Sequence, residues 1–158
     1  MTEPRIVESL GNRDLLGLHK TAFLCSQEVP ASIVLKCFDW AISMRDTGKC
    51  VISGFHSKLE KDVLAYLLKG DQPVIIALAR GMKTKIEPEI KKGLDIGRLL
   101  IITPFERNVT RVTADLAFIR NSLMANTAQE IVIGYAKSGG KVNRLMEMIE
   151  TTKNVQYL

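Results

Sequence analysis

The sequence predicts a single α/β domain of three layers, in which helices cover both faces of a mostly parallel sheet. Three observations favour this fold. The chain has 158 residues, 46% of them hydrophobic, which suits one domain with a core of its own. Short apolar stretches lack polar alternation, as strands buried on both faces do. These stretches start about 25–30 residues apart, the length of a βα unit, and segments of helical period separate them.

Each predicted strand is one of these apolar stretches: 21–25, 50–52, 74–78, 99–102, 131–133 and 155–158. The first helix is expected over 31–47, because Pro30 suits a helix start and Gly48 suits a helix end. Ser57 and Glu60 have the spacing of a capping box, which predicts a second helix that ends near Gly70.

The remaining helices follow the same rhythm. A short helix is expected over 88–93, and a longer one over 110–126 with an apolar stripe at Val112, Leu116, Ile119 and Leu123. Val142, Leu145, Met146 and Ile149 form the stripe of the last helix. Right-handed crossovers then place helices on both faces of the sheet, so we expect a Rossmann-like domain over 21–158. Residues 1–20 lack clear periodicity and are expected to form a lead-in segment before the first strand.

Composition excludes several classes of protein. With 11 Gly, 5 Pro and 3 Cys, the chain is neither collagen-like nor a disulfide scaffold, and its hydrophobic content is too high for disorder. No apolar run is long enough to span a membrane, and residues 1–5 open no signal region. Cys25, Cys37 and Cys50 lack metal-ligand spacing and are expected to be free thiols in a reducing compartment. These features predict a cytoplasmic protein without a metal, a cofactor or a membrane partner.

The charge and the strand ends together favour an anionic ligand. The chain carries 22 Lys and Arg against 17 Asp and Glu, a formal net charge of +5. Ligands of such sheets bind outside the carboxyl ends of the strands, where loops 26–30, 53–57, 79–85, 103–108 and 135–141 are expected. These loops are rich in glycine and basic residues. Backbone amides at helix starts, with Lys or Arg nearby, favour a phosphate, although short βα loops need glycine whatever they bind.

The segment Ser138-Gly139-Gly140-Lys141 is the sharpest local signal. It invites comparison with the P-loop, but the spacing from Gly134 is wrong and Val142 replaces the magnesium-binding hydroxyl. An ATPase is therefore excluded, and two interpretations stay open: a phosphate that approaches a helix start, or a plain tight turn. The dinucleotide fingerprint is also absent after the first predicted strand, which argues against NAD.

The loop after the second predicted strand offers further donors. Ser53 and Gly54 can present a hydroxyl and an amide to an anion, and His56 can contact a base or phosphate. Alternatively, Ser57 caps the next helix and His56 is simply solvated. The two histidines lie in unrelated positions and no nucleophile elbow is present, so we assign no catalytic residue.

Taken in order, these segments resemble the DNA-processing protein A family (DprA, also called Smf). Val51-Ile52-Ser53-Gly54 is similar to the family's Val-Val-Ser-Gly, and Arg120-Asn121, then Ala125 and Ser138-Gly139 follow its Arg-Asn…Ala…Ser-Gly order. The family belongs to a Rossmann-like group that includes the LOG-type phosphoribohydrolases. The resemblance implies non-catalytic binding of single-stranded DNA, and help in loading a recombinase during DNA-mediated transformation.

The chain also departs from the family pattern. The family's Gly-Ser-Arg after the first strand is Cys25-Ser26-Gln27 here, so the anion-contacting arginine is missing. The resemblance carries site roles only onto matched positions: Ser26, Ser53, Gly54, Arg120, Asn121, Ser138 and Gly139.

We therefore predict a non-catalytic binding protein for single-stranded DNA or a nucleotide-derived anion. The candidate ligand-binding residues are Ser26, Ser53, Gly54, His56, Arg80, Arg120, Asn121, Ser138, Gly139, Gly140 and Lys141. Further candidate contacts are Lys83, Lys85 and Lys137, with Phe55 and Phe105 as stacking platforms.

The alternative is a hydrolase of a nucleotide N-glycosidic bond that resembles the LOG-type enzymes. Their Pro-Gly-Gly-x-Gly-Thr loop corresponds to Ser138-Gly139-Gly140-Lys141, and Glu147 is the nearest downstream acid. Such chemistry needs a general acid or base with a tuned pKa, which the sequence does not identify. A recombinase partner follows from the resemblance alone, and a homo-oligomer stays open.

Overall fold

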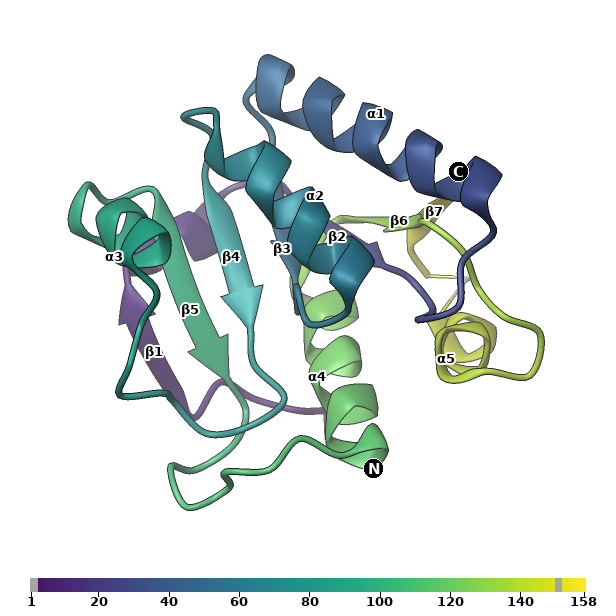
Figure 1. The fold of residues 1–158 in the computed structure, drawn as a ribbon. Helices are drawn as coiled ribbons and strands as arrows, with labels where there is room; N and C mark the ends of the chain where they lie inside the picture. Colours follow the sequence, from purple (N-terminus) through teal and green to yellow (C-terminus); the bar gives the residue numbers. More distant parts are fainter. Residues whose placement is uncertain (1–2, 150–151) are drawn as a thin grey trace.

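The computed structural model describes residues 3–149 and 152–158. Within them, one seven-stranded sheet has the order β1-β5-β4-β3-β2-β6-β7, and helices cover both of its faces (Figure 1). The strands are β1 (Glu8–Gly11), β2 (Lys20–Leu24), β3 (Cys50–Ser53), β4 (Val74–Ala77), β5 (Leu99–Thr103), β6 (Glu130–Ile133) and β7 (Asn154–Tyr157). The helices are α1 (Ala31–Thr47), α2 (Lys58–Leu68), α3 (Pro88–Asp95), α4 (Ala114–Thr127) and α5 (Lys141–Ile149). The predicted three-layer Rossmann-like class is confirmed.

The core has two halves because successive strand residues point to opposite faces of the sheet. In β2, Phe23 packs in the half formed with α1, α2 and α3, whereas Ala22 and Leu24 pack in the half formed with α4 and α5. Both faces are buried, which explains why the strands are continuous apolar stretches. All pairings among β2 to β7 are parallel, so the carboxyl ends of these strands meet at one edge.

The first strand of the sheet lies where the sequence predicts only a lead-in segment. β1 pairs antiparallel with β5, and a 3₁₀ turn, η1 (Arg13–Gly17), connects it to β2. β1 lies at the sheet edge and is only partly buried, so it carries no apolar run that would predict a strand. The stretch predicted as the first strand is therefore the second.

Helix α4 differs from its prediction in both start and buried face. It begins at Ala114 rather than 110, because the Thr113 side chain caps it by accepting a hydrogen bond from the Leu116 amide at 3.2 Å. Its buried residues are Arg120, Leu123, Met124 and Ala125, whereas Ile119 is 37% exposed. The buried face therefore includes a charged residue, Arg120, and of the predicted apolar stripe only Leu123 is buried in this helix.

The other predicted signals agree with the structure. Ser57 and Glu60 form the capping box of α2, with Glu60 N to Ser57 Oγ at 3.2 Å and Ser57 N to Glu60 Oε1 at 3.0 Å. Cys25, Cys37 and Cys50 are free and buried. In the described part of the chain, no helix has the length and apolar character needed to cross a bilayer.

Candidate functional site

The strand order creates a crevice between the ends of β2 and β6. These strands are neighbours, but the chain leaves β2 toward β3 on one side and reaches β6 on the other. Loops that diverge in this way leave space for a ligand at the carboxyl edge. A cavity of about 520 Å³ lies here, which we call the switch-point pocket. Its lining residues are Cys25, Ser26, Gln27, Glu28, His56, Ser57, Glu60, Val112, Thr113, Ala114, Ala117, Arg120, Asn121, Lys137, Gly140, Lys141 and Val142.

Arg120 is the central charged group of the pocket. Although only 5% exposed, it lines the cavity, donating from Nε to Asn121 Oδ1 at 2.8 Å and from Nη1 to the Ala77 carbonyl at 3.0 Å. Burial lowers the pKa of its guanidinium below the ordinary value, and the charge of Glu60 opposes that shift. No carboxylate among the described residues comes within ion-pair distance of Arg120. The pocket therefore holds a positive charge without a direct counter-ion.

The loop between β3 and α2 is shaped around this arginine. A Cβ built on Gly54 would collide with the Arg120 guanidinium, so only glycine leaves room for it. Phe55 follows with a φ of 48°, a left-handed conformation that costs a non-glycine residue roughly 1–3 kcal/mol. This turn directs the amides of His56 and Ser57 to Glu60 Oε1, at 3.1 and 3.0 Å. Glu60 is thereby fixed in the pocket wall.

The loops after β2 and β6 are tied together across the pocket. Ser26 N donates to the Tyr135 carbonyl at 2.8 Å, and Ser26 Oγ accepts from Lys137 N at 2.9 Å. Lys137 Nζ and Glu28 form an ion pair at 2.9 Å, which raises the pKa of Lys137. Lys141 lies 3.8 Å from a carboxylate oxygen of Asp115. Both lysines thus already face carboxylates, and they are not the free cations that the sequence suggested.

Three helices begin at this pocket. The lining includes Ser57 and Thr113, the N-caps of α2 and α4, and Gly140 with Lys141 at the start of α5. Helix N-termini carry partial positive charge and unpaired amides, so each favours an anion. Together with Arg120, they give the pocket the electrostatic character of a phosphate site.

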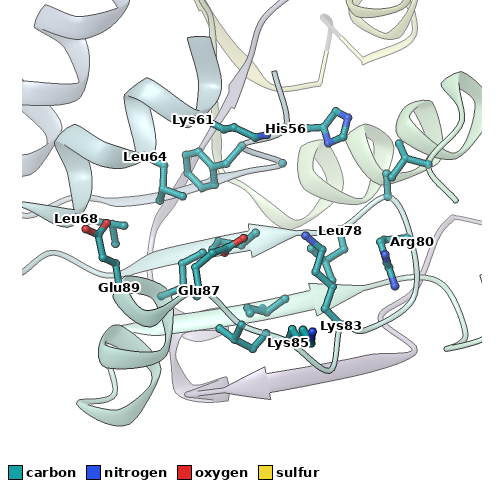
Figure 2. Close-up of a pocket in the computed structure, with 18 of the residues that line it drawn as sticks. His56, Lys61, Leu64, Leu68, Leu78, Arg80, Lys83, Lys85, Glu87 and Glu89 are labelled. Atoms are coloured by element: carbon teal, nitrogen blue, oxygen red, sulfur yellow. The ribbon is translucent and has the colours of Figure 1, made fainter. Parts of the chain in front are cut away.

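A second cavity adjoins the first between α2 and α3, with a volume of about 830 Å³, and we call it the α2–α3 cavity (Figure 2). His56, Val112 and Arg120 line both cavities. The full lining is Gly54, Phe55, His56, Lys61, Leu64, Ala65, Leu68, Ile76, Leu78, Ala79, Arg80, Lys83, Lys85, Ile86, Glu87, Pro88, Glu89, Ile90, Ile101, Val112 and Arg120.

The structure divides the predicted ligand-binding residues into three groups. The switch-point pocket brings together Ser26, His56, Arg120, Asn121, Gly140 and Lys141. The α2–α3 cavity takes Gly54 and Arg80, and shares His56 and Arg120. Ser53, Ser138 and Gly139 line neither cavity.

Two of the residues outside the cavities, Ser53 and Gly139, have structural roles. Ser53 is fully buried and donates from Oγ to the Phe23 carbonyl at 2.9 Å, so its hydroxyl joins β3 to β2. Gly139 has a φ of 73° and lies within the turn of residues 137–140, which the Gly140 amide closes by donating to the Lys137 carbonyl at 2.9 Å. Of the two interpretations of this segment, the tight turn explains Gly139, whereas Gly140 lies at the pocket.

The aromatic candidates do not form exposed platforms. Phe55 is 5% exposed and belongs to the core, with part of it on the wall of the α2–α3 cavity. Phe105 is half-buried and lines neither cavity. Sequence reasoning identified Glu60 only as a helix cap and missed Thr113 as a cap at the pocket. The residue types of Glu60 and Thr113 suit helix caps, which the sequence can show. That both lie at one pocket depends on the strand order, which the sequence does not show locally.

In the portion of the chain that the structure describes, no group of His, Cys, Asp and Glu is arranged to hold a metal ion. The lining carboxylates of the switch-point pocket are Glu28 and Glu60, and each already has protein partners.

The fold has counterparts among solved structures, although no family model and no curated protein matches the chain. DprA from Streptococcus pneumoniae superposes with a TM-score of 0.75 and 17% identity, over 94% of this chain and 53% of that protein. DprA from Helicobacter pylori superposes with a TM-score of 0.71 and 17% identity, over 93% of this chain and 69% of that protein. The molybdenum cofactor carrier protein from Chlamydomonas reinhardtii superposes with a TM-score of 0.54 and 10% identity, over 89% of this chain and 75% of that protein.

The chain thus spans about half the length of the pneumococcal DprA. At this level of identity the likeness concerns the fold, and it confirms the resemblance noted in the sequence: the chain has the Rossmann-like fold of DNA-processing protein A.

Proposed function

We propose that this protein is a non-catalytic binding module for a nucleotide phosphate, carried by single-stranded DNA or by a nucleotide-derived anion. The phosphate is held in the switch-point pocket. By the resemblance to DprA, the protein acts in DNA processing together with a recombinase.

The observation that carries the proposal is the environment of Arg120. Its guanidinium is 5% exposed, has no ion-pair partner among the described residues and lies where three helices begin. A buried charge without a counter-ion is costly, and an incoming phosphate would supply one. The H. pylori neighbour is described as binding single-stranded DNA, and the algal neighbour as carrying a cofactor, which supports this reading of the fold.

The alternative, a nucleotide hydrolase, has less support. Glu147, the acid suggested by the LOG-type loop, is exposed on α5 and lines neither cavity. Of the carboxylates in the switch-point pocket, Glu28 pairs with Lys137 and Glu60 caps α2. Incubation with nucleoside monophosphates tests the alternative, because release of free base would favour it over binding.

The test of the proposal is an anisotropy titration with a fluorescent oligothymidine at two salt concentrations, with AMP as competitor. Gln27 is exposed at the pocket where the family carries arginine, so Gln27→Arg restores a cation without disturbing the core. One added charge-assisted contact is worth about 1 kcal/mol at such a site, which predicts roughly fivefold tighter binding and a steeper salt dependence.

Gln156→Arg is the matched control, because it adds the same charge at an exposed position that lines neither cavity. Flat titrations at low salt, for both the oligonucleotide and AMP, would contradict the proposal. Binding of AMP alone would identify a nucleotide-derived anion as the ligand, whereas competition between the two would mean that both occupy one site, as the proposal requires.

A further inference from the structure

The α2–α3 cavity differs chemically from the switch-point pocket, with which it shares only His56, Val112 and Arg120, and the proposed function places the phosphate in the pocket rather than here. Leu64 and Leu68 of α2 line it together with Ile86 and Ile90, which lie before and within α3. All four pack in or against the core on this face and still leave about 830 Å³ between the elements. This volume lies within the roughly 300–1,000 Å³ of small-molecule sites, which are also mostly apolar.

Three lysines line this apolar space. The side chains of Lys61, Lys83 and Lys85 line the cavity and have no ion-pair or hydrogen-bond partner among the described residues. Figure 2 shows Lys61 and His56 along one side of the cavity, and Lys83 and Lys85 along the other. Glu87 and Glu89 line the part next to α3, so the negative charge of the lining is confined to that end.

The wall of the cavity also contains the strained residue of the β3–α2 loop. Phe55 adopts a φ of 48° and is 5% exposed at the cavity wall. Conformations of this kind persist where the surroundings determine them, and they gather at ligand sites. The strain thus falls on a residue that shapes the cavity.

We propose that the α2–α3 cavity binds a small organic anion made of an apolar body and one phosphate, sulfonate or carboxylate group. The apolar body lies between Leu64 and Ile90, where its burial provides the driving force. The acidic group lies toward Lys83 and Lys85, where the apolar surroundings strengthen its attraction to the ammonium groups. A DNA backbone suits this space poorly, because its regularly spaced phosphates would meet an apolar floor.

The experiment uses 8-anilinonaphthalene-1-sulfonate, an aromatic anion whose fluorescence rises in apolar sites. Ala65 is exposed on α2 and lines the cavity, so Ala65→Phe fills the space without altering the core. We expect saturable binding by the native protein and at least tenfold weaker binding by Ala65→Phe. The double variant Lys83→Gln/Lys85→Gln should bind roughly threefold to tenfold more weakly.

The control for charge is Lys91→Gln/Lys92→Gln, which removes two exposed lysines of α3 that do not line the cavity and should leave binding unchanged. Fluorescence of Trp40, which stacks on Phe23 at 4.8 Å, reports that each variant is folded. Displacement by dodecanoate would identify an acyl anion as the ligand type, and displacement by AMP a nucleotide. Absence of binding to the native protein, or equal binding to folded Ala65→Phe, would overturn the proposal.

This test is separable from that of the proposed function. Ala65 lies outside the switch-point pocket, so folded Ala65→Phe should keep its affinity for oligothymidine. If Ala65→Phe loses dye binding and keeps DNA binding, the result tests the α2–α3 cavity only. The Gln27→Arg variant tests the switch-point pocket only, because Gln27 does not line the α2–α3 cavity.

Discussion

Gly54→Ala should displace Arg120 and weaken both the fold and the binding of an anion. The added Cβ would stand 3.0 Å from Arg120 Nε and closer still to Cζ and Nη1, where carbon atoms normally keep about 3.4–4 Å. Relief of this clash requires the guanidinium to move by roughly an ångström. The 3.0 Å bond from Nη1 to the Ala77 carbonyl would then be lost inside the protein.

A hydrogen bond to a charged group contributes about 1.5–3 kcal/mol, which sets the expected loss of unfolding free energy. Urea denaturation followed by Trp40 fluorescence measures it, and the oligothymidine titration should show roughly tenfold or greater weakening. Gly17→Ala is the control, because a Cβ there meets nothing within 4 Å. In an Arg120→Met background the clash partner is gone, so Gly54→Ala should cost less than about 0.5 kcal/mol. Equal costs in the two backgrounds would mean that the Arg120 side chain is not what requires glycine at position 54.

Two further predictions concern the core. Leu123→Ala should lower the free energy of unfolding, measured in urea, by about 2–5 kcal/mol. Ile119→Ala on the same helix should lower it far less, because the Ile119 side chain is 37% exposed. Equal losses of unfolding free energy would mean that the buried face of α4 is misplaced. Burial raises the pKa of the Cys50 thiol to about 11 from an ordinary value near 9.0, so the native state holds this proton more tightly than the unfolded state. The resulting stabilisation is complete below about pH 9 and is lost as the pH rises through about 11. The difference in unfolding free energy between native protein and Cys50→Ala should therefore shrink over that interval, and a constant difference would contradict this view.

The sequence was informative wherever one residue type decides the local structure. Buried parallel strands need continuous apolar stretches, so β2 to β7 were predicted within a residue or two of their observed bounds. Capping chemistry was equally local, and the pair Ser57 and Glu60 was identified from its spacing. β1 escaped prediction because a half-exposed edge strand needs no apolar run and takes its partner from β5, far along the chain.

The site was less predictable because it depends on tertiary contacts. Lys137 pairs with Glu28 over a sequence separation of 109, so nothing local shows that its charge is compensated. On pattern alone Arg120 is an ordinary polar residue, and only the family resemblance made it a candidate; its burial against Gly54 and Ala77 could not be predicted from the sequence. The α2–α3 cavity could not be predicted for a different reason: no local pattern marks Leu64 or Ile90, and the cavity depends on how α2 and α3 are placed in the fold.

A nucleotide phosphate is proposed to bind beside Arg120 at the starts of α2, α4 and α5. Amide and guanidinium NMR shifts, followed during titration with oligothymidine and with AMP, test this binding site. We expect the largest shifts at Arg120 Nε and at the amides of Ser57, Ala114 and Gly140, which all line the switch-point pocket. Saturable shifts confined to residues away from this pocket, or no shifts with either ligand at low salt, would contradict it.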